Sequence, residues 1–115
     1  MDAALQRRVQ RYGWDKASAY YEQFWAAQLR PAQDKLLELA ELRPGEAVID
    51  IAAGTGLVTF RAAEAVGPTG RVLGTDISEK MVAVATEEAA RRGLSGTVEF
   101  RRADAEKLAA PDGSF

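Results

Sequence analysis

The sequence predicts an α/β protein built on a doubly wound parallel sheet. Three stretches, 47–53, 71–76 and 97–101, have the β-branched or alternating composition of strands. Helix-like segments, 57–66 and 78–92, separate them. Strands joined through helices pair in parallel by right-handed crossovers. Glycines and carboxylates follow the strands, as expected at a ligand-binding edge. We therefore expect three parallel strands in the spatial order 3-2-1.

Two helices are expected before the first strand. Residues 1–11 are polar and weakly patterned, so we expect them to fray. Apolar residues at steps of three and four then predict a helix with an aromatic face, formed by Ala17, Tyr20, Tyr21, Phe24, Trp25 and Leu29. We expect this helix to break at Arg30, because a residue before proline avoids the helical region. Pro31 then suits the first position of a second helix.

The stretch Val48–Gly56 is the centre of the predicted chemistry. It begins as a buried strand, which Asp50 interrupts, and it ends in a turn that contains Gly54 and Gly56. The helix predicted over 57–66 follows directly, with Gly67 as its C-terminal cap. A strand, a glycine turn and a helix N-terminus direct free backbone N–H groups toward one point. This geometry is typical of a site for a nucleotide-like ligand.

Two further loops add carboxylates to the same edge of the sheet. The second strand ends at Asp76, and Ser78 is placed to cap the helix that follows. The third strand leads into a polar loop with Asp104 and Ala105. Because ligands of open parallel sheets bind at the carboxyl ends of the strands, we expect all three loops to meet there.

Composition limits the class of protein. The chain has 115 residues, of which 47% are apolar and 28% charged, and this suits one globular domain. Its net charge of −2 does not indicate general affinity for nucleic acid or for an anionic membrane. Cysteine and histidine are both absent, which excludes disulfides and imidazole chemistry, and we expect no metal site. No apolar run is long enough to span a bilayer, so a cytoplasmic location is expected.

The residues are compatible with two kinds of ligand, a nicotinamide dinucleotide and a ligand that carries a positive charge and an exocyclic amino group. A nicotinamide dinucleotide site needs the pattern G-x-G-x-x-G and an acidic residue about 20 positions later. Asp76 meets the second condition, but Thr59 stands where the third glycine belongs. Asp50 also lies where a pyrophosphate would have to sit, and it suits a cationic ligand better. Asp104 can accept from an exocyclic amino group.

These motifs resemble a known family. Val48–Gly56 resembles motif I of the class I S-adenosylmethionine-dependent methyltransferases, and Gly74–Ser78 resembles the second-strand motif of that family. Residues 102–106 and 111–115 resemble the segment that enters its fourth strand. The subgroup that fits best is the small-molecule methyltransferases similar to quinone C-methyltransferases. Ala53 departs from the cysteine of many members, but both residues are small.

The resemblance covers residues 15–115 and implies a Rossmann-like fold and an enzyme that transfers a methyl group to a small molecule. The implied cofactor is S-adenosyl-L-methionine, which leaves as S-adenosyl-L-homocysteine. The resemblance implies that Asp50 faces the amino group of the methionine part, that Asp76 accepts from the ribose and that Asp104 accepts from the adenine amine. The full set of implied cofactor-binding residues is Asp50, Ala52, Gly54, Gly56, Asp76, Ile77, Met81, Asp104, Ala105 and Tyr20. No catalytic base is assigned.

Each of these residues has a structural alternative. Asp76 can simply cap a helix, and Asp104 can be a turn residue. Ile77 and Met81 can be ordinary core residues, and so can the aromatic helix face. Asp50 is the hardest to explain in this way, because a carboxylate in a buried strand needs partners.

The resemblance also implies two regions and an incomplete fold. Residues 1–45 are expected to form a helical segment that covers the cofactor or substrate, and residues 46–115 the first half of the cofactor-binding domain. The family continues with a fourth strand beside the first, so we expect a truncated sequence, a second chain that completes the sheet, or a fragment that binds without catalysing. Two other functions stay open, a fragment of an NAD(P)-binding oxidoreductase and a non-catalytic S-adenosylmethionine-binding or interaction module.

Overall fold

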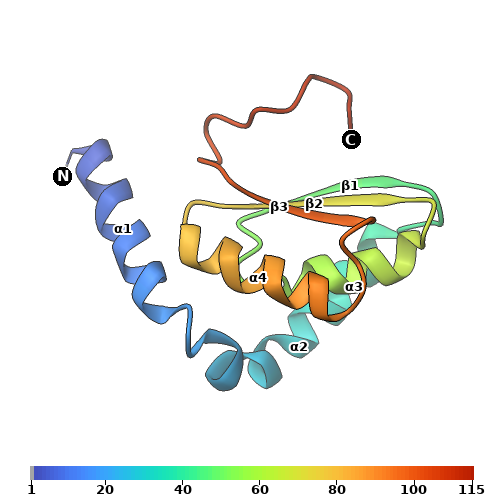
Figure 1. Cartoon of the computed structure of the whole chain (residues 1–115), viewed down its shortest axis with the longest axis horizontal. Coiled ribbons are helices and arrows are strands. Elements are labelled where there is room, and N and C mark those ends of the chain that lie inside the picture. Colours follow the sequence, from blue (N-terminus) through green and yellow to red (C-terminus); the bar gives the residue numbers. More distant parts are fainter. Residues whose placement is uncertain (1) are drawn as a thin grey trace.

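A computed structural model of the protein describes residues 2–115, apart from the side chains of Tyr21 and Glu22. Helices and strands alternate after an N-terminal pair of helices (Figure 1). In chain order the elements are α1 (Ala3–Ala17), α2 (Tyr21–Ala40), β1 (Ala47–Ile51), α3 (Leu57–Val66), β2 (Arg71–Asp76), α4 (Glu79–Arg91) and β3 (Val98–Arg102). The α/β class is thus confirmed, whereas the two helices before the sheet have other bounds than predicted.

The sheet is parallel, with β2 between β1 and β3, as the predicted order 3-2-1 requires. Val72 of β2 pairs with Val48 on one side and with Val98 on the other. Because all three strands run the same way, their carboxyl ends lie at one edge of the sheet. The loops after β1, β2 and β3 therefore meet where the sequence predicts a ligand.

The hydrophobic core lies between the sheet and the two helices α3 and α4, which cover the same face (Figure 1). Its largest side chain is Phe60 of α3, whose ring meets the ring of Phe100 edge to face with centroids 5.6 Å apart. A Cβ atom on Gly74 would lie 2.6 Å from the ring of Phe100, so β2 needs glycine there. The segment after β3 passes over the opposite face of the sheet.

Two predicted helix caps are present, Ser78 at the start of α4 and Gly67 at the end of α3. Ser78 Oγ accepts a hydrogen bond from the Met81 amide at 3.1 Å, which satisfies a free N–H of α4. Gly67 follows α3 with a φ of 67°, a conformation that favours glycine. The strands differ only at their ends from the predicted ranges, since β1 stops at Ile51 and β3 is shifted by one residue.

Residues 1–11 were expected to fray, and this prediction is wrong for the described residues, since α1 begins at Ala3. The physical reason is an N-cap: the Asp2 carboxylate accepts from the amides of Ala4 and Leu5 at 3.3 and 3.4 Å. The helix expected from Ala17 is also displaced, because α1 ends there and α2 begins after a short turn.

The predicted break at Arg30 is wrong as well, because α2 continues through Pro31. Two ion pairs lie near the proline, one within α2 and one to α3. Asp34, one turn after the proline, pairs with Arg61 of α3 at 2.6 Å and with Arg30 at 3.3 Å. Among the described helices, none is both long enough and apolar enough to cross a membrane.

Candidate functional site

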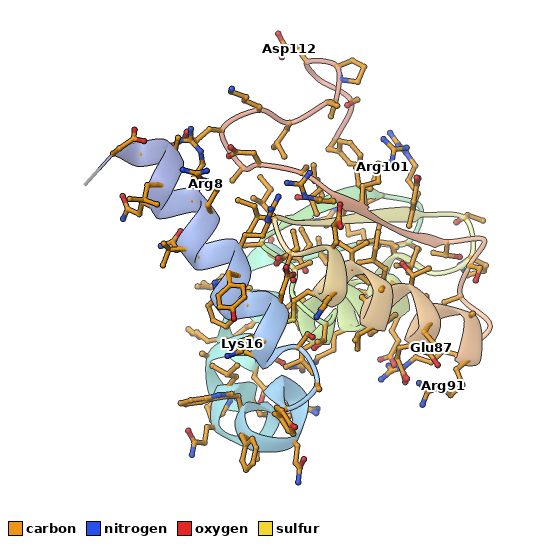
Figure 2. All side chains as sticks on the ribbon, turned by 60° about the vertical axis from the view of Figure 1, so that its left-hand side comes forward. Arg8, Lys16, Glu87, Arg91, Arg101 and Asp112 are labelled. Carbon is orange, nitrogen blue, oxygen red and sulfur yellow. The ribbon has the colours of Figure 1, made fainter. Side chains whose placement is uncertain are left out.

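A cavity of about 370 Å³ lies at the edge where the three strands end. The three loops and α1 form its walls, and Figure 2 shows α1 passing this edge between Arg8 and Lys16. Its lining includes the predicted site residues Ala52, Gly54, Asp76, Ile77, Met81, Asp104 and Ala105, together with Arg7, Gln10, Trp14, Ile51, Thr75, Ala103 and Glu106. Of the other predicted site residues, Asp50, Gly56 and Tyr20 do not line it.

Asp76 connects the first loop to the second. Its Oδ2 accepts from the Gly54 amide at 2.8 Å, and its Oδ1 accepts from the Ser78 amide at 3.0 Å. The bond to Ser78 is the local one that a simple helix cap would make, whereas the bond to Gly54 spans 22 residues. Each carboxylate oxygen can accept a second hydrogen bond, so Asp76 keeps capacity for hydroxyl groups in the cavity.

The two glycines of the turn do different things. Gly54 has a φ of 60°, lines the cavity, and has open space where a Cβ atom would lie. Gly56 has a φ of 95°, and a Cβ atom there would lie 2.7 Å from Phe60 and 2.9 Å from Phe100. Gly56 is therefore required by the packing of the core, while Gly54 leaves bare backbone facing the cavity.

Ala52 is a non-glycine residue in the left-handed region, with a φ of 61°. Such a conformation costs about 1–2 kcal/mol for a residue with a side chain. Ala52 lies directly after β1 and borders two cavities, the one described above and a second of about 240 Å³. Backbone strain of this kind is often found at binding sites.

Asp50 faces the second cavity, which lies between α2 and the start of α3. Its Oδ2 accepts from Thr59 Oγ1 at 2.7 Å. Burial raises the pKa of Asp50 above its ordinary value of 3.8, the bond from Thr59 opposes this, and the negative charge of Asp76 adds a smaller increase. The remaining residues of this cavity are Leu29, Ala32, Gln33, Leu36, Ala53, Leu57 and Val58.

Sequence reasoning did not identify the residues that α1 contributes. Arg7, Gln10 and Trp14 line, from one side of this helix, the larger of the two cavities that Ala52 borders, which we call the larger cavity. Arg7 pairs with Asp104 at 3.5 Å and with Glu106 at 3.3 Å, and Ser78 Oγ donates a short hydrogen bond to Asp15. Arg7, Gln10 and Trp14 follow one another at steps of three and four, which places them on one face of a helix. This spacing is informative only if the segment is helical, and the sequence signal for a helix here is Asp2 as its N-cap.

The aromatic face of α2 lies elsewhere. Tyr20 is 59% exposed, and its ring lies 6.4 Å from that of Phe24, which is 62% exposed. Trp25 is half exposed too, so the alternative that this face is core is wrong for these residues. The side chain of Tyr21, which belongs to the same predicted aromatic face, lies outside the described residues.

Comparison with known proteins agrees with this geometry. Residues 42–115 match the family described as a methyltransferase domain. The chain is 44% identical over 102 residues to the nocamycin O-methyltransferase of Saccharothrix syringae, covering 89% of this chain and 36% of that protein. It is 47% identical over 79 residues to the ubiquinone/menaquinone biosynthesis C-methyltransferase UbiE of Ectopseudomonas mendocina, covering 69% of this chain and 31% of that protein.

A solved structure supports the same assignment. The crystal structure of a SAM-dependent methyltransferase from Aquifex aeolicus superimposes with a TM-score of 0.63 at 31% identity, over 70% of this chain and 42% of that one. The chain thus spans about a third of the two curated relatives described above. The matched family, the parallel sheet and the loops that meet at its edge agree, and the chain belongs to the class I S-adenosylmethionine-dependent methyltransferases.

Proposed function

We propose that this chain binds S-adenosylmethionine in the larger cavity and supplies the cofactor-binding part of an enzyme that methylates a small molecule. The observation that carries the proposal is the cavity itself, where three strand-end loops bring together Gly54, Asp76 and Asp104. Family membership favours this cofactor over a nicotinamide dinucleotide.

The residues of the cavity fit the adenosine part of this cofactor. Asp76 would accept from the ribose hydroxyls with the lone pairs that its two backbone bonds leave free. Asp104 would accept from the adenine amine, beside the backbone of Ala105. Ile77 supplies apolar surface for the purine ring, and Met81, which is 1% exposed, lies behind it in the wall of the cavity.

The methionine part would lie at the border between the two cavities. Ala52 lies on this border, and Asp50 lies in the second cavity. A cationic amino group near Asp50 would favour its ionised form, which burial disfavours in the free protein. Gly54 has open space in front of its backbone, so a ligand can approach it closely.

The cofactor supplies an electrophilic methyl group on a sulfonium centre, and the protein aligns it and excludes water. We propose a small organic acceptor, because the two curated relatives are named an O-methyltransferase and a C-methyltransferase of small molecules. We also propose a cytoplasmic location, no nucleic-acid partner, and a second chain or a further segment that completes the sheet beside β1.

Calorimetric titration with S-adenosylhomocysteine tests the proposal. We expect saturable binding that weakens in Gly54→Ala, because the added methyl group would enter the cavity. Gly93→Ala is the matched control, since Gly93 also has a positive φ, 69°, and open space at its Cβ position but lies at the end of α4. Equal binding by the two variants would contradict the proposed site, and no binding by the wild type would contradict the proposed cofactor.

A methyl-transfer assay with labelled S-adenosylmethionine and candidate acceptors then separates the enzyme from a non-catalytic binding module. If the protein is an enzyme, the labelled methyl group should appear in an acceptor. Binding without transfer to any acceptor would favour the module.

A further inference from the structure

Helix α1 is attached to the rim of the larger cavity by polar contacts. None of its fifteen residues is buried, so little apolar packing holds it in place. At its N-terminal half, Arg7 pairs with two acidic residues of the loop after β3. At its C-terminal half, Asp15 accepts a hydrogen bond from Ser78.

The two attachments differ in strength. Ser78 is fully buried and also caps α4, while Ser18 Oγ donates to the Asp15 carbonyl at 2.9 Å and closes the end of α1. The C-terminal half is therefore the fixed end. The side chains of Arg7, Asp104 and Glu106 are 36%, 27% and 73% exposed, so salt screens both ion pairs at the other end, and the pair with Glu106 more strongly.

The Asp104 carboxylate can accept further hydrogen bonds while it is paired with Arg7. Asp104 Oδ1 accepts from the Glu106 amide at 2.9 Å, and the other oxygen, Oδ2, lies 3.5 Å from Arg7 Nε. A carboxylate offers about four acceptor positions, so positions remain for an amino group in the cavity. Arg7 thus orients the carboxylate and faces the same cavity.

We propose that Arg7 is a positioning residue of the cofactor site, which holds Asp104 in place and fastens the N-terminal half of α1 over the adenine end of the cavity. The proposal rests on the proposed function, because the adenine end is defined by the cofactor. Its consequence is that Arg7 slows release of the cofactor, and that salt weakens this effect.

The experiment measures affinity and release of S-adenosylhomocysteine by stopped-flow fluorescence at low and high salt. Trp25→Phe is used as the background, because the chain has two tryptophans and Trp14 lines the cavity. Arg7→Gln is compared with Arg8→Gln, an exposed neighbour on the same helix that is not among the lining residues (Figure 2). Arg7→Lys keeps the charge.

At low salt we expect Arg7→Gln to weaken binding and speed release by about two- to tenfold, the range for one or two partly exposed ion pairs. At high salt, the affinity and the release rate of the wild type should approach those of Arg7→Gln. Arg7→Lys should retain part of the wild-type affinity, and Arg8→Gln should have the affinity and the release rate of the wild type. Equal affinity and equal salt dependence in Arg7→Gln and Arg8→Gln would overturn the proposal.

Acrylamide quenching of Trp14 without ligand separates this proposal from the proposed function. Stronger quenching in Arg7→Gln than in Arg8→Gln supports the attachment of α1, and equal quenching overturns it. If the wild type binds no S-adenosylhomocysteine, the proposed function fails, and with it the part of this inference that concerns the cofactor.

Discussion

At the scale of single residues, Asp50 shows a conflict between folding and binding. Its carboxylate is partly buried in β1 and receives one side-chain hydrogen bond, from Thr59. Burial raises its pKa, so the ionised form is disfavoured in the folded protein. A carboxylate in this position makes physical sense if a cation binds beside it, which is the place we propose for the methionine amino group.

The substitution Asp50→Asn should raise stability at neutral pH and weaken cofactor binding. A raised pKa means that folding favours the protonated form, so the stabilisation by this group is present below pH 3.8 and is lost as pH rises through the raised value. Asparagine does not ionise and can still accept from Thr59. Thermal unfolding at pH 7 and pH 4 measures the effect, and the variant's advantage should shrink at pH 4.

The control for this prediction is Asp112→Asn, at an exposed position in the segment after β3 (Figure 2). It should change neither the melting temperature nor the binding of S-adenosylhomocysteine. A lower melting temperature of Asp50→Asn at pH 7 would show that the ionised carboxylate is satisfied in the folded protein.

At the scale of elements, α2 contains the clearest departure from local preference. A proline inside a helix removes one backbone hydrogen bond and crowds the preceding turn. Nevertheless α2 runs through Pro31, and the ion pair between Asp34 and Arg61 holds its second half against α3. The helix therefore carries the cost of the proline, and the ion pair to α3 offsets at most a part of it.

The substitution Pro31→Ala should stabilise the protein by about 1–3 kcal/mol, because it restores a helical N–H and removes the steric conflict. Chemical denaturation and far-UV circular dichroism measure the change. The matched control is Pro68→Ala, in the turn between α3 and β2, which should have a much smaller effect. Unchanged or reduced stability in Pro31→Ala would indicate that the helix is interrupted at the proline.

At the scale of the whole molecule, stability is unevenly distributed. β2 lies between two strands, and its Val72 and Thr75 are almost completely buried. β1 has β2 as its one partner strand within the described residues. α1 buries none of its residues and is held by the polar contacts of Arg7 and Asp15. Regions with few buried contacts open at lower free energy than the core.

Amide hydrogen exchange should therefore be slowest in β2 and fastest among the helices in α1. S-adenosylhomocysteine should slow exchange in α1 and in the turn around Gly54, because both border the proposed site. Mass spectrometry of peptic peptides, with and without the ligand, measures both effects. Protection of α1 equal to that of α4 without ligand would contradict this ranking.

The sequence by itself determined the sheet and most of the site. β-branched runs, a glycine turn and helix caps are local signals, and they predicted three parallel strands and the edge where their loops meet. Gly54, Asp76 and Asp104 were predictable for the same reason, because each lies at the end of a strand or within three residues after it.

Only the tertiary structure decided how the N-terminal helices lie and what they add. α2 runs through Pro31 against local preference, and Asp34 in its second half pairs with Arg61 of α3, which is distant in sequence. Arg7 pairs with residues nearly a hundred positions away, so local periodicity could not assign it to the cavity. The different roles of Gly54 and Gly56 likewise depend on the packing of Phe60 and Phe100. Only this packing shows that Gly56 faces the core and that Gly54 faces the cavity.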